Sequence, residues 1–350
     1  MFMKAAVLRN NVEIKAEEYS RRYPELPWVE EPLSIDDVDD PYINFNQALV
    51  KVAVCGVCYT DIDIIEGRVR CKLPVILGHQ IVGKVVDIGK NVYGYSIGDK
   101  VGIAWIGHTC NKCFYCKSGQ ENLCEEFKAT GCNIDGGYAE YVAVYSNYMY
   151  HVPRNLDDEY VAPLMCAGAV GYRALKLVQM IDGLRLGLFG FGSSAHIVMQ
   201  IARKLYPSSE IYVFTRSDHH KDLAKKLGAD WVGSPYEDPP KKINRAIDFT
   251  PVGETIARAL EVLDRGGKLV VNVIRKQSSI NLDYLKHVWQ EKELKSVANV
   301  TRADVKELLE IVKLYPINIH IQIYTLNDVN KALRDLKMAK IKGSPVLRIP

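Results

Sequence analysis

Short apolar strands and amphipathic helices alternate through the second half of the chain, and this alternation limits the possible folds more than any other feature. The run LRLGLFG (184–190) predicts a buried strand, and apolar residues follow it at helical spacing from Ile197 to Leu205. Further strands are predicted at 211–215 and at KLVVNV (268–273). Strands and helices that alternate at this spacing form βαβ units, so this half is predicted to be a doubly wound parallel sheet with helices on both faces.

The first 150 or so residues have a different pattern, in which short apolar runs are separated by Gly, Pro and Asp. Examples are ALVKVAV (48–54), IVGKVVDIG (81–89) and AEYVAVY (139–145). Several short strands with turn residues between them predict a β-rich barrel or sandwich. The acidic stretch from Glu17 to Asn46 is expected to be an excursion on the surface.

Length and composition describe an ordinary globular protein. The chain has 350 residues, which is enough for two domains, and its net charge is only +3. No dense Lys/Arg block favours a nucleic-acid or anionic-membrane partner, and no apolar run has the length of a signal peptide or a membrane span. We therefore expect a cytoplasmic protein, whose nine cysteines serve metal binding or chemistry rather than disulfides.

Four cysteines lie within fifteen residues, at Cys110, Cys113, Cys116 and Cys124. Two-residue gaps let successive thiolates face one ion, and the longer excursion brings the fourth thiolate to complete a tetrahedron. Zinc with four sulfur ligands has no open position, so such a site is structural. An iron–sulfur cluster is the alternative, but the CxxxCP partner motif that usually accompanies its CxxCxxC is absent.

A glycine motif joins the strand at 184–190 to the helix that follows. In this setting GFGSSA is typical of a dinucleotide-binding turn: Gly190 permits the turn, Gly192 admits the pyrophosphate, and Ala195 lets helix and sheet pack. The helix N-terminus supplies N–H groups to the phosphates. The residues predicted to contact the cofactor here are Gly190, Gly192, Ser193, Ser194 and Ala195.

The end of the next strand indicates which cofactor is preferred. Where NAD-specific enzymes carry a carboxylate, this chain has Thr215, Arg216 and Ser217, and Lys221 follows. Hydroxyl and guanidinium groups would receive a 2′-phosphate, which favours NADP(H) over NAD(H). The alternative is that Arg216 covers the adenine of NAD, and Asp218 counts in its favour.

A second set of metal ligands is spread along the chain, with Cys58 in CGVCYTD, His79 in LGHQ and Cys166 in APLMCAG. Two thiolates and one imidazole leave the fourth zinc position open, as a catalytic zinc requires. Taken singly, a cysteine or histidine of this kind is more often a packing or turn residue.

The order of these motifs resembles the zinc-containing alcohol dehydrogenases of the medium-chain dehydrogenase/reductase superfamily. CGVCYTD, GHQ, the four cysteines, DGGYAEYV (135–142), APLMCAGAVGYRAL (162–175), GFGSSA and LGAD (227–230) carry the match over nearly the whole chain. The resemblance implies two zinc ions per subunit, a catalytic one on Cys58, His79 and Cys166 and a structural one on the four cysteines. It also implies a packing role for Cys55 and an orienting role for Asp61.

The resemblance implies a domain plan as well. A GroES-like β-rich catalytic domain would comprise 1–155 and 296–350, with a structural zinc lobe at about 107–125, and a Rossmann domain would comprise 156–295. Relatives are homodimers or homotetramers joined through sheet edges, for which KLVVNV is the candidate edge strand.

The implied activity is reversible hydride transfer between a small alcohol or aldehyde and NAD(P)(H). Thr60 would take the alcohol proton and pass it towards the cofactor ribose, and Thr250 would lie near the nicotinamide. Asp63 stands where many relatives use a histidine to pass the proton to solvent; it would serve as a carboxylate relay, with exit through water or a plain surface position for Asp63 as the alternatives. One alternative is a zinc-independent quinone reductase of the same fold, whose members lack the cysteine ligands. Another is a zinc-ribbon-like binding protein, for which a basic face is expected and a nucleotide loop is not.

Overall fold

The structure is a computed structural model that describes residues 2–12, 28, 31–341 and 343–350. Two compact units divide the chain. Unit 1 contains Met1–Cys166, Thr301–Leu309 and His320–Pro350, and unit 2 contains Ala167–Val300 and Glu310–Ile319.

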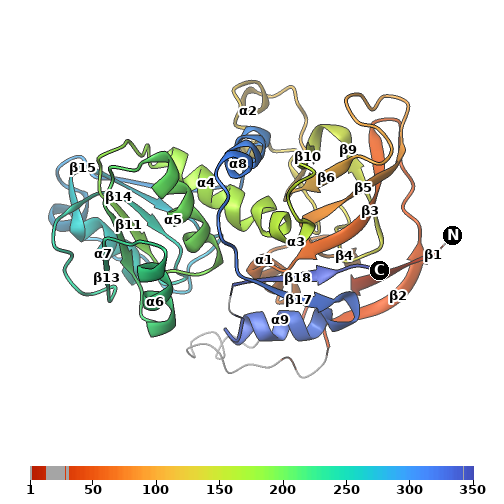
Figure 1. Cartoon of the computed structure of the whole chain (residues 1–350). Coiled ribbons are helices and arrows are strands. Elements are labelled where there is room, and N and C mark those ends of the chain that lie inside the picture. Colours follow the sequence, from red (N-terminus) through yellow and green to blue (C-terminus); the bar gives the residue numbers. More distant parts are fainter. Residues whose placement is uncertain (1, 13–27, 29–30, 342) are drawn as a thin grey trace. The chain divides into compact units, whose positions relative to one another are not determined.

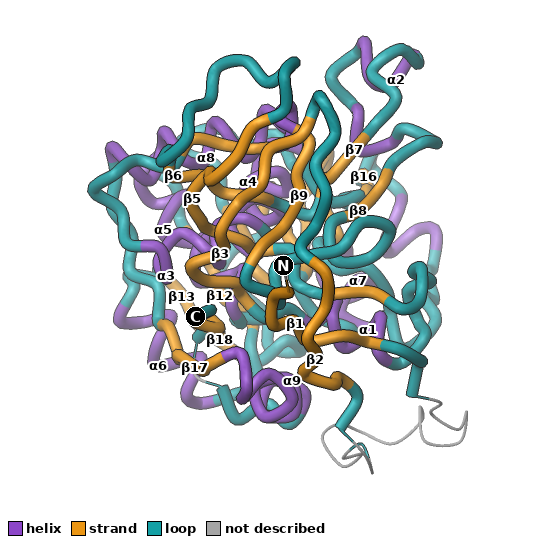
Figure 2. The backbone as a smooth tube through the Cα atoms, turned by 90° about the vertical axis from the view of Figure 1, so that its right-hand side faces the viewer, coloured by secondary structure: helices purple, strands orange, loops and turns teal. Residues whose placement is uncertain are grey.

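Unit 1 is built on a seven-stranded, mostly antiparallel sheet in the order β10-β6-β5-β3-β18-β17, with β9 also paired to β3. Figure 2 shows β5, β3 and β9 side by side. The C-terminal strand β18 lies between β3 and β17, so segments far apart in the sequence build one sheet. The strands are β3 (Gln47–Gly56), β5 (Gln80–Ile88), β6 (Lys100–Ile103), β9 (Tyr141–Tyr145), β10 (Met149–His151), β17 (Ile321–Thr325) and β18 (Ser344–Arg348).

Smaller elements complete unit 1. A three-stranded sheet joins β2 (Leu33–Asp39), β1 (Phe2–Leu8) and β4 (Val75–Ile76), and β7 (Ile106–His108) pairs with β8 (Lys128–Ala129). The apolar residues of β1, β3 and β5 meet in one buried core with those of α1 and α9. The helices are α1 (Tyr59–Ile65), α2 (Phe114–Lys117), α3 (Asp158–Val161) and α9 (Val329–Lys337).

Unit 2 has the predicted doubly wound architecture (Figure 1). Six strands pair in the order β13-β12-β11-β14-β15-β16, and every neighbouring pair is parallel. β11 and β12 are buried along their whole length, as expected of strands that helices cover on both faces. The strands are β11 (Leu186–Phe189), β12 (Ile211–Phe214), β13 (Trp231–Gly233), β14 (Ile243–Asp248), β15 (Leu263–Val271) and β16 (Glu293–Ser296); the helices are α4 (Ala167–Leu177), α5 (Ser193–Leu205), α6 (Asp218–Lys226) and α7 (Glu254–Val262). The helix α8 (Arg302–Leu314) has residues in both units.

The structure contradicts two expectations and bears on a third. KLVVNV is not an edge strand, because it lies largely in β15 between β14 and β16. The stretch from Glu17 to Asn46 contains β2, which pairs with β1, and part of that stretch lies outside the described residues. Cys71 and Cys132 form a disulfide, so the expectation that the cysteines avoid disulfides is wrong for this pair.

Within the described part of the chain, no helix has both the length and the apolar character needed to cross a membrane.

Candidate active site and structural metal centre

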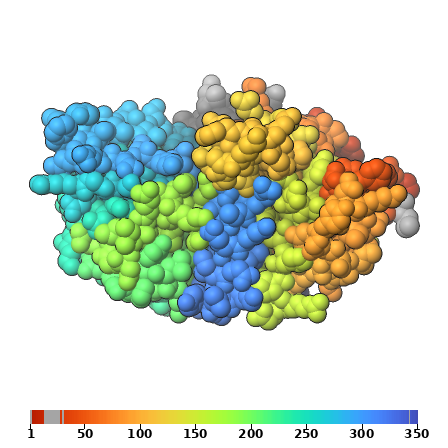
Figure 3. Space-filling model, turned by 90° about the horizontal axis from the view of Figure 1, so that it is seen from above, coloured from red at the N-terminus to blue at the C-terminus, as the bar shows by residue number. Residues whose placement is uncertain are grey.

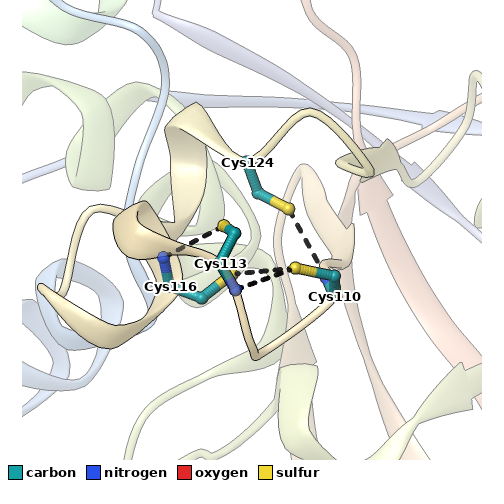
Figure 4. Close-up of side chains that lie close together, drawn as sticks. All are labelled: Cys110, Cys113, Cys116 and Cys124. Carbon is teal, nitrogen blue, oxygen red and sulfur yellow. Dashed lines mark hydrogen bonds between the residues drawn. The ribbon is translucent and has the colours of Figure 1, made fainter.

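The four cysteines of the lobe converge on one point. Their sulfur atoms all lie within 4.8 Å of one another, and those of Cys110 and Cys116 are 3.9 Å apart (Figure 4). The backbone N–H of Cys113 donates to Sγ of Cys110 at 3.3 Å, and the N–H of Cys116 donates to Sγ of Cys113 at 3.5 Å at the start of α2. N–H groups that point at sulfur stabilise thiolates, and those of Lys112 and Cys113 lower the pKa of Cys110 to about 7. The set fits a closed four-sulfur metal site.

The lobe is exposed on its outer side and attached to unit 1 on its inner side. Figure 3 shows its residues, coloured gold, at the molecular surface. On the inner side, the buried Thr109 hydroxyl lies 2.7 Å from the Tyr148 hydroxyl, and the Cys116 thiol lies 3.5 Å from the same Thr109 oxygen. The lobe has little apolar core, so these polar contacts and a bound ion would supply its order.

A second cluster brings together the three separated ligand candidates. Cys58 caps the N-terminus of α1, His79 immediately precedes β5, and Cys166 follows a short 3₁₀ turn at Ala162–Met165. One ligand atom from each residue lies within 4.8 Å of the others. His79 is fully buried, and neither of its ring nitrogens has a hydrogen-bond partner among the described residues.

Buried polar atoms without partners are costly, and coordination to a metal would satisfy the imidazole. Two sulfurs and one nitrogen are a donor set suited to zinc, with one position left for another ligand. The residues therefore fit a catalytic zinc. The two clusters account for seven cysteine and histidine side chains, and the buried Cys55 belongs to neither.

The charge balance at this cluster depends on Asp61. Its Oδ2 accepts the N–H of Cys58 at 2.8 Å, and its Oδ1 lies 3.5 Å from Nδ1 of His79. Burial lowers the pKa of His79, but the Asp61 carboxylate and neighbouring groups outweigh burial and raise that pKa to about 10. A hydrogen bond from Cys166 holds the pKa of Cys58 well below its usual value. The cluster thus stabilises a Cys58 thiolate, the form that binds a divalent cation.

The two residues predicted to move the proton occupy different surroundings. Oγ1 of Thr60 lies 3.6 Å from Sγ of Cys58, beside the candidate metal site. Asp63 is buried and accepts a hydrogen bond from Nε of Arg68 at 2.6 Å, and Arg68 also pairs with Glu66. Glu66 in turn pairs with Lys337 of α9. Asp63 thus belongs to a buried ion-pair network, which no local sequence pattern predicts.

The predicted cofactor turn has the expected backbone. Gly190 directly follows β11 and has φ of +83°, and a Cβ there would lie 3.0 Å from Cγ2 of Thr250. Gly192 caps α5, and a Cβ there would meet no atom within 4 Å. Ser193 and Ser194 form the first turn of α5, and Ala195 is fully buried. The turn leaves space beside the N-terminus of a 13-residue helix, where an anion is favoured.

The residues predicted to select the cofactor follow β12. Thr215 is buried, whereas Arg216 and Ser217 are exposed and lead into α6. Lys221 forms an ion pair with Asp218 at 3.2 Å, so part of its charge is already neutralised.

One charged pair at the same edge of the sheet was missed. Asp248, at the end of β14, is fully buried and forms an ion pair with Lys276, whose Nζ also donates to the carbonyl of Thr250 at 2.6 Å. The backbone N–H of Thr250 donates to Asp248 at 2.9 Å. An aspartate at the end of an apolar strand was the available signal, but its partner lies 28 residues further on.

Comparison with known proteins finds two family models. The alcohol dehydrogenase GroES-like domain matches residues 44–154, and the zinc-binding dehydrogenase model matches residues 195–313. The chain is 41% identical over 310 residues to "Probable alcohol dehydrogenase AdhA" of Mycobacterium tuberculosis (strain CDC 1551 / Oshkosh), covering 87% of this chain and 89% of that protein.

Two further similarities come from a bacterium and a plant. An alcohol dehydrogenase of Geobacillus stearothermophilus is 33% identical over 327 residues, covering 91% of this chain and 96% of that protein. A cinnamyl alcohol dehydrogenase structure from Sorghum bicolor superposes with a TM-score of 0.85 at 22% identity, covering 99% of this chain and 98% of that chain. The structural likeness shows the fold, and the sequence similarities show the family.

Proposed function

The chain belongs to the zinc-type alcohol dehydrogenases of the medium-chain dehydrogenase/reductase superfamily, and we propose that Cys58, His79 and Cys166 are the ligands of its catalytic zinc. It is an NAD(P)-dependent alcohol oxidoreductase. The proposed reaction is the reversible transfer of a hydride between a small alcohol or aldehyde and the nicotinamide. We further propose the domain ranges 1–155 with 296–350, and 156–295, for the catalytic and nucleotide-binding parts.

One observation carries the assignment of the ligands: neither ring nitrogen of the fully buried His79 makes a hydrogen bond to a described residue, and the ring lies beside two cysteine sulfurs. When bound there, zinc supplies a Lewis acid that polarises the hydroxyl or carbonyl group of the substrate. The four lobe cysteines are proposed to hold a second, structural zinc, which makes two ions per subunit.

The protein's own groups are proposed to orient the reactants and move the proton. Thr60 lies beside Cys58, and its hydroxyl is proposed to take the proton that the alcohol loses while it passes its own proton on towards the cofactor ribose. The ion pair of Asp63 with Arg68 favours a role in fixing the end of α1 over direct proton transfer to solvent. Thr250 follows β14 and is proposed to contact the nicotinamide end of the cofactor.

The cofactor is proposed to be NADP(H) in preference to NAD(H). Glycines 190 and 192 and the first turn of α5 would receive the pyrophosphate. Thr215, Arg216 and Ser217 would bind the 2′-phosphate, because none of them repels an anion. Lys221 would assist, although Asp218 competes for its charge.

A homodimer or homotetramer is proposed to form through β16, the edge strand next to β15. All four residues of β16 are exposed, and exposed apolar side chains occur in it and in the chain segment just before it. An unpaired edge flanked by apolar residues favours pairing with a second copy. These side chains are Tyr284, Leu285, Val288, Trp289 and Leu294.

The test is a panel of small alcohols and aldehydes, assayed with NAD(H) and NADP(H) in parallel, with a quinone included. We expect alcohol- and aldehyde-dependent turnover that is faster with NADP(H). Turnover with the quinone alone would instead support the zinc-independent reductase of the same fold.

A further inference from the structure

Tyr138 joins two parts of the candidate zinc site from a position that is fully buried. Its hydroxyl donates a hydrogen bond to Oδ2 of Asp61 at 2.8 Å. The same oxygen accepts the backbone N–H of Cys58 at 2.8 Å. Oδ2 of Asp61 thus accepts hydrogen bonds from the backbone of Cys58 and from the hydroxyl of Tyr138. The other carboxylate oxygen, Oδ1, lies 3.5 Å from Nδ1 of His79.

The backbone of residues 136–138 also forms hydrogen bonds with the segment that leads to His79. Gly136 donates to the carbonyl of Ile76 at 2.8 Å, Gly137 to that of Gly78 at 2.9 Å, and Tyr138 to that of Leu77 at 3.0 Å. The described chain thus fixes the three residues before His79 by main-chain hydrogen bonds from one short segment.

The tyrosine ring packs against the glycine that precedes His79. Gly78 has φ of +94°, and a Cβ there would lie 2.5 Å from Cδ1 of Tyr138. The ring thus occupies the space that a side chain at Gly78 would need. Tyr138 therefore contacts the backbone beside one zinc ligand with its ring and reaches the carboxylate beside another with its hydroxyl.

Hydrogen bonding to Asp61 has an electrostatic consequence. Burial and then the charge of Asp61 raise the pKa of Tyr138 well above its usual value, so the hydroxyl stays protonated and acts as a donor. A donor to a carboxylate reduces the negative charge that the carboxylate presents to its other neighbours. Groups around metal ligands orient those ligands and tune the metal in this way.

We propose that Tyr138 is a positioning residue of the catalytic zinc site, holding Asp61 through its hydroxyl and the Gly78–His79 backbone through its ring. This inference rests on the proposed zinc ligands and adds a residue beyond them. It acts through Asp61 and through the backbone at Gly78.

The test uses the full-length protein loaded with cobalt(II), whose visible absorption reports ligand geometry. Tyr138→Phe removes the hydroxyl and keeps the ring. Tyr150→Phe is the matched control, because Tyr150 is also buried in unit 1 and its hydroxyl has no hydrogen-bond partner among the described residues. Cobalt release to a chelator is followed in each variant, and Cys58→Ser identifies the phase that belongs to the catalytic site.

We expect Tyr138→Phe to shift the cobalt absorption bands. It should also speed the release of cobalt from the catalytic site by on the order of 10-fold, because groups that support metal ligands strengthen metal binding. Tyr150→Phe should leave both unchanged. In an Asp61→Asn background, the added effect of Tyr138→Phe should shrink, because the charge that it moderates is gone. The proposal is overturned if Tyr138→Phe matches Tyr150→Phe, or if its effect is undiminished in Asp61→Asn. If Cys58→Ser abolishes no cobalt phase, the proposed zinc ligands themselves are wrong, and Tyr138 then has no zinc site to position.

Discussion

The carboxylate of Glu121 accepts two hydrogen bonds from Arg302, one from its backbone N–H at 2.9 Å and one from its Nε at 3.1 Å. Glu121 lies within the four-cysteine lobe, and Arg302 is the first residue of α8. The guanidinium of Arg302 also lies 5.4 Å from the centre of the Tyr148 ring, whose hydroxyl meets Thr109 beside Cys116. The lobe is therefore tied to the start of α8 by a buried carboxylate.

Replacing Glu121 should destabilise the fold. Glu121→Ala leaves two donors of Arg302 without their acceptor in a largely buried position, so we expect the free energy of unfolding to fall by about 1–3 kcal/mol. Glu121→Gln keeps one acceptor and should lose less. Denaturant unfolding measures both. The control is Glu310→Ala, which removes an exposed pair with Lys313 and should change stability by less than about 0.5 kcal/mol; equal losses for Glu121→Ala and Glu310→Ala would disprove the role of the buried pair.

Removing one lobe sulfur should cost one metal ion. A closed four-sulfur site loses most of its affinity when one ligand is replaced, so Cys116→Ser should lower the zinc content from about two ions per chain to about one. Elemental analysis of the purified protein gives the count. Cys55→Ala serves as control, since Cys55 is buried but belongs to neither cluster. A full zinc content in Cys116→Ser would show that the lobe is not a metal site.

The two glycines of the cofactor turn should respond differently to alanine. Gly192→Ala adds a methyl group where no atom lies within 4 Å, so the fold should keep its stability while cofactor affinity falls, because the methyl group takes the space that the pyrophosphate needs. Gly190→Ala should lose stability as well, because φ at that position is +83°. Thermal unfolding and fluorescence titration with NADPH separate the two effects. Unchanged affinity in a stable Gly192→Ala would place the cofactor elsewhere.

Arg216 should determine the preference for the phosphorylated cofactor. Arg216→Ala removes a charge-assisted contact to the 2′-phosphate, which should raise KM for NADP⁺ by about 10-fold or more and leave KM for NAD⁺ nearly unchanged. Steady-state kinetics with both cofactors give the comparison. Lys226→Ala, at the far end of α6, is a control for loss of positive charge. An equal rise in both KM values would instead support stacking of Arg216 on the adenine.

The features that could be predicted from the sequence are those that a local motif marks. The four cysteines lie within fifteen residues, and the glycine turn directly follows its strand, so both were visible in the sequence. Cys58, His79 and Cys166 are far apart, and their convergence was inferred only through resemblance to a family. The alternation in the second half was enough to predict a parallel sheet, because its buried strands are strongly apolar.

Other features depend on tertiary contacts that no local pattern reports. KLVVNV is expected at an edge, but β16 pairs outside it; all four residues of β16 are exposed, and only one residue of its ELKS sequence is apolar. The Tyr138–Asp61 hydrogen bond and the Asp248–Lys276 ion pair join residues that are distant in sequence. The Cys71–Cys132 disulfide follows no spacing rule of the kind that marks the lobe.

The most direct measurement of the central claim is alcohol-dependent reduction of NADP⁺ and NAD⁺ by wild type and Cys58→Ser, with zinc content determined on the same samples. Wild type should hold about two zinc ions per chain and oxidise alcohols. Cys58→Ser should retain only the lobe ion and lose alcohol oxidation, with its fold intact by circular dichroism. Alcohol oxidation that persists in Cys58→Ser, or a full zinc content in that variant, would contradict the assignment of Cys58, His79 and Cys166 as the catalytic metal site.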